Sequence, residues 1–198
     1  MGPMILIAAI AAVAFPVVFT LDGWTRPDYG PRRQPVSALA LGPRGWVQTA
    51  NFLLVGAGIV VGAAGLAGSQ PWSAIAIGVL GCALIASGAW RMDPMRGYPP
   101  GTPDTTPDSF SIAHRRHDQA GAIVFGGFPA AAAVVALTGD DPLLRWSSLA
   151  VALVSGFLAT RFATAWENDA PDAGRWQRLF LWVAFIWLAA VFVTGRPE

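Results

Sequence analysis

The sequence contains no lysine, a single cysteine and few charged residues of either sign. Charged residues make up 13% of the 198 residues, and the net charge is +1. That charged share is about half of what soluble proteins carry. So few charges cannot cover a water-soluble domain, and most of the chain is therefore expected to lie in lipid. The small net charge gives no whole-molecule attraction to nucleic acid, so no nucleic-acid partner is expected.

The common catalytic motifs are also missing. The sequence has no phosphate-binding loop, no Gly-x-Ser-x-Gly, no His-Glu-x-x-His and no pair of cysteines. The one cysteine, Cys82, lies in an apolar run, where packing is its expected role. No acidic residue lies in the middle of an apolar segment as a proton relay would require, which argues against an ion-driven transporter.

Long apolar segments dominate what is present, and hydrophobic residues make up 54% of the chain. A helix needs roughly 20 apolar residues to cross about 30 Å of hydrocarbon. Six segments meet this requirement, at approximately 3–21, 46–67, 72–91, 119–138, 143–165 and 176–194. The sequence therefore predicts an all-α polytopic membrane protein, with six transmembrane helices in a single transmembrane domain covering residues 1–198.

The connections between these segments alternate in length. Residues 68–71 and 139–142 are tight turns rich in Gly, Pro and Asp, whereas the first, third and fifth connections are longer and polar. This alternation predicts three helical hairpins, with the short turns on one membrane face and the long loops on the other.

Arginines are concentrated on the face of the long loops. Eleven lie in or beside these loops: Arg26, Arg32, Arg33, Arg44, Arg91, Arg96, Arg115, Arg116, Arg161, Arg175 and Arg178. Arg145 and Arg196 lie on the opposite face. The positive-inside rule then predicts a multi-pass plasma-membrane protein with cytoplasmic long loops and both termini outside. If several of these arginines form a binding site, however, they no longer report the orientation.

The loops at 22–45 and 92–118 are expected to form a polar mouth. Asp93 and His117 are its candidate catalytic acid/base pair, because a carboxylate at the hydrocarbon boundary should have a raised pKa. Candidate ligands offer guanidinium, amide or hydroxyl groups: Arg32, Arg33, Ser37, Asn51, Arg96, Tyr98, Gln177 and Arg178. Three aromatic residues would line the apolar part: Trp90, Trp182 and Phe125. A structural alternative stays open, in which Asp and Arg pair and tie loops to helices.

His114 and His117 are the only candidate metal ligands, because imidazoles three residues apart on a helix lie on neighbouring faces. Arg115 and Arg116 lie between them and would repel a divalent cation. The sequence thus favours no metal and no other cofactor, and zinc is the ion that the spacing would allow.

Small residues at Gly58 and Gly62 allow helix backbones to approach closely. Packing within a compact bundle is sufficient to explain them. The same Gly-x-x-x-Gly pair is the expected contact if the protein forms a homodimer.

Several stretches carry a resemblance to a known family. They lie at 29–31, 36–39, 45–52, 93–102, around His117 and at 177–178, and Asp-Pro followed by Gly-Tyr-Pro-Pro-Gly-Thr is the most specific of them. In these stretches the sequence resembles the mainly actinobacterial six-helix membrane family described as domain of unknown function 998. The resemblance covers nearly the whole chain and implies the six-helix topology, without an activity that could be transferred.

These features favour a protein that binds a membrane lipid or isoprenoid-type amphiphile at the polar mouth. Whether the protein also modifies that ligand, as an enzyme would, the sequence leaves open. One alternative is a non-enzymatic assembly or accessory subunit that docks a partner through its arginine-rich face. Another is a metal-dependent membrane hydrolase.

Overall fold

The computed structural model describes residues 2–194 and, within that range, contains helices and loops but no β-strand. Six long helices follow one another: α1 (Pro3–Thr25), α2 (Gly45–Leu66), α3 (Pro71–Ala89), α4 (Ile112–Thr138), α5 (Pro142–Glu167) and α6 (Ala173–Thr194). All six are long and apolar enough to cross a membrane. The predicted all-helical class is confirmed, and the chain is a multi-pass integral membrane protein. Arg196, counted above for orientation, lies outside the described residues.

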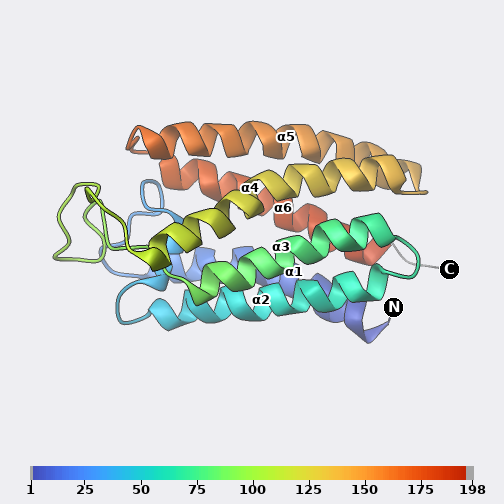
Figure 1. Ribbon diagram of the computed structural model, residues 1–198, viewed down its shortest axis with the longest axis horizontal. Coiled ribbons are helices and arrows are strands. Elements are labelled where there is room, and N and C mark those ends of the chain that lie inside the picture. Colours follow the sequence, from blue (N-terminus) through green and yellow to red (C-terminus); the bar gives the residue numbers. More distant parts are fainter. Residues whose placement is uncertain (1, 195–198) are drawn as a thin grey trace.

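The helices run side by side, with the long loops gathered at one end of the bundle (Figure 1). The start of α1 and the end of α6 lie at the other end, together with the two short turns (Figure 1). Each helix packs against its neighbours along the chain, and α6 closes against α1. The turns join α2 to α3 and α4 to α5 as two hairpins, and the first and last helices form the third antiparallel pair.

Local signals set where the helices begin. Pro71 and Pro142 occupy the first positions of α3 and α5, where a backbone N–H would have no partner anyway. The fourth helix begins at Ile112, although the apolar pattern alone placed its start near 119. Ser111 explains the difference, because its hydroxyl accepts a hydrogen bond from the backbone N–H of His114 at 3.0 Å and caps the helix. Both histidines are therefore helical.

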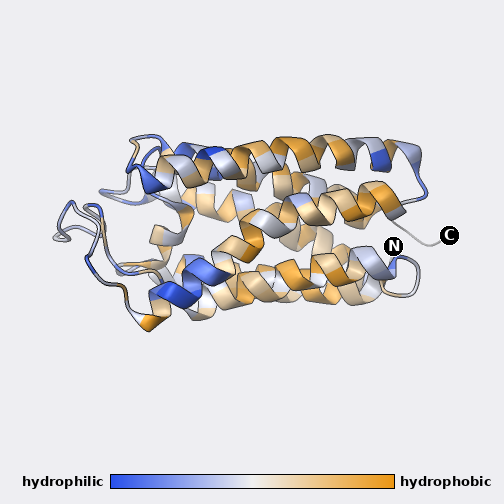
Figure 2. Cartoon of the chain, turned by 45° about the horizontal axis from the view of Figure 1, so that its top comes forward, coloured by the Kyte–Doolittle hydropathy of each residue, from blue (hydrophilic) through white to orange (hydrophobic). Residues whose placement is uncertain are grey.

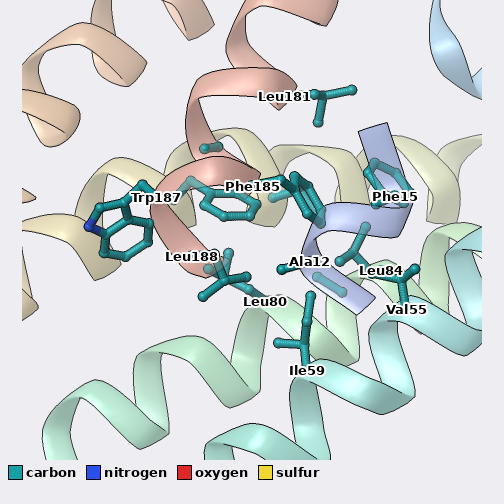
Figure 3. Packing of buried hydrophobic residues seen from close by; sticks show 14 of the residues in the cluster. Ala12, Phe15, Val55, Ile59, Leu80, Leu84, Leu181, Phe185, Trp187 and Leu188 are labelled. Carbon is teal, nitrogen blue, oxygen red and sulfur yellow. The ribbon is translucent and has the colours of Figure 1, made fainter. Parts of the chain in front are cut away.

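Aromatic side chains fill the interior of the bundle. Six phenylalanines are almost completely buried: Phe15, Phe19, Phe128, Phe180, Phe185 and Phe192. Phe15 of α1 stacks on Phe185 of α6 with ring centroids 4.4 Å apart, and Phe128 of α4 lies 5.1 Å from Phe185. Figure 3 shows the rings of Phe15 and Phe185 near aliphatic side chains of α2 and α3, such as Ile59 and Leu80. The core thus joins all parts of the ring of helices.

Hydrophobic residues run along the length of the helices (Figure 2), and many large apolar side chains are exposed on their outer sides. Ile10 of α1 is 61% exposed, Leu54 of α2 is 72% exposed and Leu153 of α5 is 68% exposed. Hydrophilic residues gather instead at the loop end of the bundle (Figure 2). An apolar belt of this extent suits lipid as the surrounding solvent.

Glycines bring α2 close to its neighbours on both sides. A Cβ atom on Gly81 would lie 2.8 Å from the carbonyl oxygen of Gly56, so α2 and α3 touch through their backbones. A Cβ on Gly58 would lie 2.8 Å from Ala11 of α1, and one on Gly62 would overlap Ala8. Gly58 and Gly62 therefore pack α2 against α1 within one chain. A homodimer through the same two glycines stays a prediction.

Candidate functional site

A buried acid and two arginines tie the first loop to the end of α1. The carboxylate of Asp22 lies 2.5 Å from Nη2 of Arg26 and 2.6 Å from Nη2 of Arg44. Arg26 also donates to the carbonyl oxygen of Leu41 at 2.9 Å and to the hydroxyl of Tyr98 at 3.2 Å. Since Asp22 and Arg26 are both buried, these groups fix the loop and are not available to a ligand.

Arg178 docks the same loop onto α6. Its guanidinium donates to the carbonyl of Gln34 at 2.9 Å and also to the carbonyl of Pro31 and the hydroxyl of Tyr29. Burial raises the pKa of Tyr29 to about 12, so its hydroxyl stays protonated. That hydroxyl donates in turn to the carbonyl of Pro35 at 2.9 Å. The first loop is therefore an ordered cover over the start of α6.

Two more arginines connect the loops to one another. Arg33 makes two hydrogen bonds to Asp104, at 2.8 and 3.2 Å, and lies 3.3 Å from Asp169. The guanidinium of Arg96 lies 4.0 Å from the ring centroid of Trp166 and donates to its carbonyl oxygen at 2.8 Å. These contacts join the loop between α3 and α4 to the loop between α1 and α2 and to the connection between α5 and α6.

Asp93 holds the start of α4. Its two carboxylate oxygens accept hydrogen bonds from the backbone N–H and the hydroxyl of Ser111, each at 2.7 Å. Burial alone would raise the pKa of Asp93, but the bonds from Ser111 outweigh it and hold the pKa below the usual aspartate value. The raised pKa expected from the sequence is therefore wrong, because that expectation did not include the Ser111 donors.

His114 is held at both ring nitrogens. The backbone N–H of Asp93 donates to Nδ1 at 2.8 Å, and Nε2 lies 3.1 Å from the carboxylate of Asp118. The ring also stacks on Phe110 with centroids 4.2 Å apart. Since Nδ1 accepts, the neutral ring carries its hydrogen on Nε2 and directs it toward Asp118.

The hydrogen-bonding role of Nδ1 in His117 is opposite to its role in His114. Its Nδ1 lies 2.9 Å from the carbonyl oxygen of Trp90 and 3.1 Å from that of Ser87, at the end of α3. Carbonyl oxygens only accept, so Nδ1 carries the hydrogen and Nε2 of the neutral ring keeps a free lone pair. The ring is buried, and His117 lines a cavity. His117 is thus positioned to accept a hydrogen bond from a ligand.

The cavity, of about 350 Å³, lies between α4 and α5 near the loops. Its lining residues are Pro35, Ser37, Met92, His114, His117, Asp118, Gly121, Ala122, Phe125, Ala159, Phe162, Ala163, Trp166, Glu167 and Gln177. Ala122 of α4 and Ala163 of α5 are exposed, so the cavity opens on the side of the bundle between these helices. A smaller cavity of about 30 Å³ continues from its polar end toward Phe15 and Leu84.

The polar end of the cavity offers both donors and acceptors. The side-chain oxygen of Gln177 accepts from the backbone N–H of Val36 at 2.5 Å, which leaves the amide N–H groups to donate. His117 offers an acceptor, and the hydroxyl of Ser37 can do either. All three residues line both the large and the small cavity.

Aromatic rings form the wall beyond these groups. Phe125 lies between Phe162 and Phe180, with centroids 4.8 and 4.7 Å away, and Trp166 continues the wall along α5. The acidic side chains of Asp118 and Glu167 lie at the exposed rim. No arginine is among the described residues that line the cavity.

The family of the chain is shown by its sequence. Residues 9–194 match a family described as protein of unknown function (DUF998), and the match covers nearly all of the chain. The chain belongs to the DUF998 family. No curated protein and no solved structure matches it. Because the family description carries no activity, the function of this DUF998 protein has to be argued from its cavity.

The structure of this DUF998 protein brings part of the predicted site together. His117, Ser37, Gln177 and Phe125 meet in the cavity. Three predicted arginine ligands instead bond other parts of the loops: Arg33, Arg96 and Arg178. Asn51 donates to the carbonyl of Phe15 at 3.1 Å.

The other predicted residues lie outside the cavity. Tyr98 contacts Arg26, and Asp93 contacts Ser111. Trp90 lies under Arg116 at an outer groove between α3 and α4. Arg32 and Trp182 lie at a separate groove on α6.

Sequence reasoning missed most of the cavity wall in α4 and α5. Once α4 is known to begin at Ile112, a stripe at helical spacing appears along it: His114, His117, Asp118, Gly121, Ala122 and Phe125. The cap at Ser111 was the signal that could have revealed this stripe. Phe162 and Trp166 of α5 gave no such signal, because they fit an ordinary lipid-facing or core helix equally well.

The Nδ1 atoms of the two histidines have different hydrogen-bonding partners. Nδ1 of His114 accepts from a backbone N–H, and Nδ1 of His117 donates to carbonyls. Over residues 2–194 no three His, Cys, Asp or Glu side chains lie close enough together to hold a metal ion.

Proposed function

We propose that this protein binds a neutral, hydroxyl-bearing lipid or isoprenoid-type amphiphile in the cavity between α4 and α5. One observation carries the proposal: the cavity combines a hydrogen-bonding inner end with an aromatic wall, and it opens on the apolar side of the bundle. Its volume of about 350 Å³ is in the range of small-molecule sites. An amphiphile could enter directly from the surrounding lipid.

The hydrogen-bonding groups favour a hydroxyl head. Nε2 of His117 requires a donor on the ligand, the amide N–H groups of Gln177 require an acceptor, and Ser37 accommodates either. A hydroxyl group provides both functions in one atom. A simple hydrocarbon would leave these buried groups unpaired, which is costly.

The charges at the cavity favour a head without negative charge. Asp118 and Glu167 lie at the rim, and the nearby arginines Arg33, Arg96 and Arg178 are engaged by other partners. A phosphate entering here would approach two acidic groups and meet no guanidinium. Within this proposal the headgroup is thus recognised by hydrogen bonds.

Any modification of the bound amphiphile would rest on His117. Its Nε2 can accept the hydroxyl proton of the ligand, as a general base does. Asp93 would contribute indirectly, because its contacts with Ser111 and His114 position the first turn of α4. For its location, we propose the plasma membrane with the loop end in the cytoplasm, on the basis of the arginine distribution.

The proposal can be tested by filling the cavity from α4. A Cβ atom at Gly121 would meet no other atom within 4 Å, and Gly121 lines the cavity, so Gly121→Leu places its side chain in the cavity. The probe is a fatty alcohol with a photoactivatable diazirine in its chain, compared with the alkyl phosphate of the same chain. The wild type should crosslink the alcohol in preference to the phosphate, and Gly121→Leu should lower the crosslinking about tenfold, equivalent to about 1.4 kcal/mol.

Gly126→Leu is the matched control. Gly126 lies on the same helix and does not line the cavity, and a Cβ atom added there would also meet no other atom within 4 Å. This variant should crosslink like the wild type. Equal labelling of Gly121→Leu and wild type, or preferential labelling by the phosphate, would refute the proposal.

A further inference from the structure

A second depression, of about 330 Å³, lies on the outer face of α6, apart from the cavity between α4 and α5. The first loop and α6 form it together, through Pro31, Arg32, Arg175, Arg178, Leu179 and Trp182. None of these residues lines the larger cavity. We call this surface the α6 groove.

Two guanidinium groups lie at the loop end of the α6 groove. The backbone N–H of Arg175 donates to the carbonyl of Arg32 at 2.9 Å, which keeps the two residues side by side. Both side chains are exposed, and within residues 2–194 neither guanidinium has a hydrogen-bonding or ion-pair partner. The nearby Asp172 is engaged by the indole N–H of Trp176, at 3.0 Å. Among the described residues, neither guanidinium at the loop end of the groove is paired with a carboxylate.

Arg178 makes the groove rigid. Its guanidinium bonds the carbonyls of Pro31, Gln34 and Gly174 and thereby fixes the loop against the helix. A Cβ on Gly174 would overlap the carbonyl of Gln34, so the backbones of loop and helix are in direct contact there. The groove is thus formed before any ligand binds, which reduces the entropic cost of binding.

An apolar stripe continues from the arginines along α6. Leu179 is 41% exposed and Ile186 is 57% exposed, and Trp182 lies between them at helical spacing. The ring of Trp182 rests edge-on against Phe19, with centroids 6.5 Å apart. The stripe is therefore an exposed apolar surface that begins beside the arginines at the loop end of α6 and continues along the helix.

We infer that the α6 groove binds an anionic phospholipid, with its phosphodiester between Arg32 and Arg175 and one acyl chain along Leu179 and Trp182. Guanidinium forks match phosphate oxygens in geometry and charge, and basic pockets at helix ends recognise anionic headgroups. A free phosphate would use only the arginines and leave the apolar stripe unoccupied. The combination of paired charge and adjoining stripe therefore favours the lipid.

The inference can be tested by lipid retention in native mass spectrometry. The full-length protein is reconstituted in nanodiscs containing equal amounts of phosphatidylglycerol and phosphatidylcholine and then released in the mass spectrometer. The wild type should retain phosphatidylglycerol in preference to phosphatidylcholine. Arg32→Gln combined with Arg175→Gln should abolish this preference, which should also weaken at high salt because exposed charges are screened.

Arg91→Gln combined with Arg145→Gln is the matched control, since it removes the same charge outside the groove and should leave the preference unchanged. Gly121→Leu should also leave it unchanged, so that failure of the cavity proposal and failure of this one are distinguishable. Equal retention of both lipids by the wild type would overturn the inference. So would an undiminished preference in the Arg32/Arg175 double variant, or an equal loss in the control.

Discussion

Asp93 illustrates how a single residue can serve the candidate site without entering it. Its carboxylate accepts two hydrogen bonds from Ser111, and the hydroxyl of Ser111 caps α4 by accepting from the N–H of His114. A negative charge at this position also interacts favourably with the positive end of the helix. Asp93 thereby fixes the helical turns from which His117 reaches the cavity.

Replacement of Asp93 by Asn should lower the melting temperature of the purified protein at neutral pH. Hydrogen bonds to a charged group contribute about 1.5–3 kcal/mol, and each kcal/mol corresponds to about 2–4 °C in a protein of this size. The pKa of Asp93 is lower in the folded state, so its stabilising contribution is complete above the unfolded pKa of about 4. The contribution is lost as the pH falls through the lower folded pKa.

The measurement is the difference in melting temperature between wild type and Asp93→Asn across an acidic pH series in detergent. This difference should shrink as the pH falls below about 4. Asp108→Asn is the control, because Asp108 lies exposed in the same loop. A difference for Asp93→Asn that stays constant down to the lowest pH would show that the carboxylate charge does not stabilise α4.

The sequence located the polar residues at the correct end of the protein but could not say which were free to bind a ligand. Arg33 pairs with Asp104, far away in the chain, and Arg178 bonds mainly to backbone carbonyls. A sequence does not show which backbone carbonyls accept hydrogen bonds from a side chain. Ion pairs between residues far apart in the chain depend on how the loops fold. His117 and Gln177 were predicted as site residues, but their roles as acceptor and donor follow only from Trp90 and Val36 as partners.

At the scale of elements, the pair α2 and α3 depends on mutual glycine contacts. The two helices meet where Gly56 and Gly81 face each other, and a Cβ at either position would approach the carbonyl oxygen of the other within 2.8 Å. In lipid, where the hydrophobic effect does not drive helices together, such close packing is a main source of helix association.

Gly81→Ala should therefore lower the melting temperature, because its methyl group would force α2 and α3 apart. The reference is Gly126→Ala, since a Cβ at Gly126 meets nothing within 4 Å. That substitution should be neutral or stabilising, as alanine favours the helix by about 0.5–1 kcal/mol over glycine. Thermal unfolding of both variants in the same detergent gives the comparison, and an equal response of the two would contradict close packing at Gly81.

Apolar length predicted the six helices because lipid requires long apolar segments whatever their partners are. Because these segments are apolar on all sides, the sequence did not show which side of each helix faces the interior of the bundle. In α5, Leu153 faces outward while Phe162 lines the cavity, although both fit the same apolar pattern. In a membrane helix the lipid-facing side chains are apolar, as the buried ones are. The periodicity of apolar residues therefore cannot distinguish a cavity wall from a lipid-facing surface.

For the whole molecule, the asymmetric placement of arginine has more than one cause. Arg26, Arg33, Arg96 and Arg178 bond to loop carbonyls or acids, so the folded loops need them on either side of a membrane. Other exposed arginines at the loop end bond to no carbonyl or acid among the described residues: Arg32, Arg91, Arg116, Arg161 and Arg175. The position of these arginines bears on orientation, because the folded loops do not need them as hydrogen-bonding or ion-pair partners.

The free arginines predict a cytoplasmic loop end, and cysteines introduced at exposed serines test this orientation. Ser109 lies exposed in the long third connection and Ser69 in the turn between α2 and α3, at opposite ends of the bundle. In intact cells a membrane-impermeant maleimide should label Ser69→Cys but not Ser109→Cys, which should react only after permeabilisation. The wild type controls for Cys82, which lies within α3. The reverse pattern would place the loops outside, and the arginines would then be explained by loop structure and by lipid binding at the α6 groove.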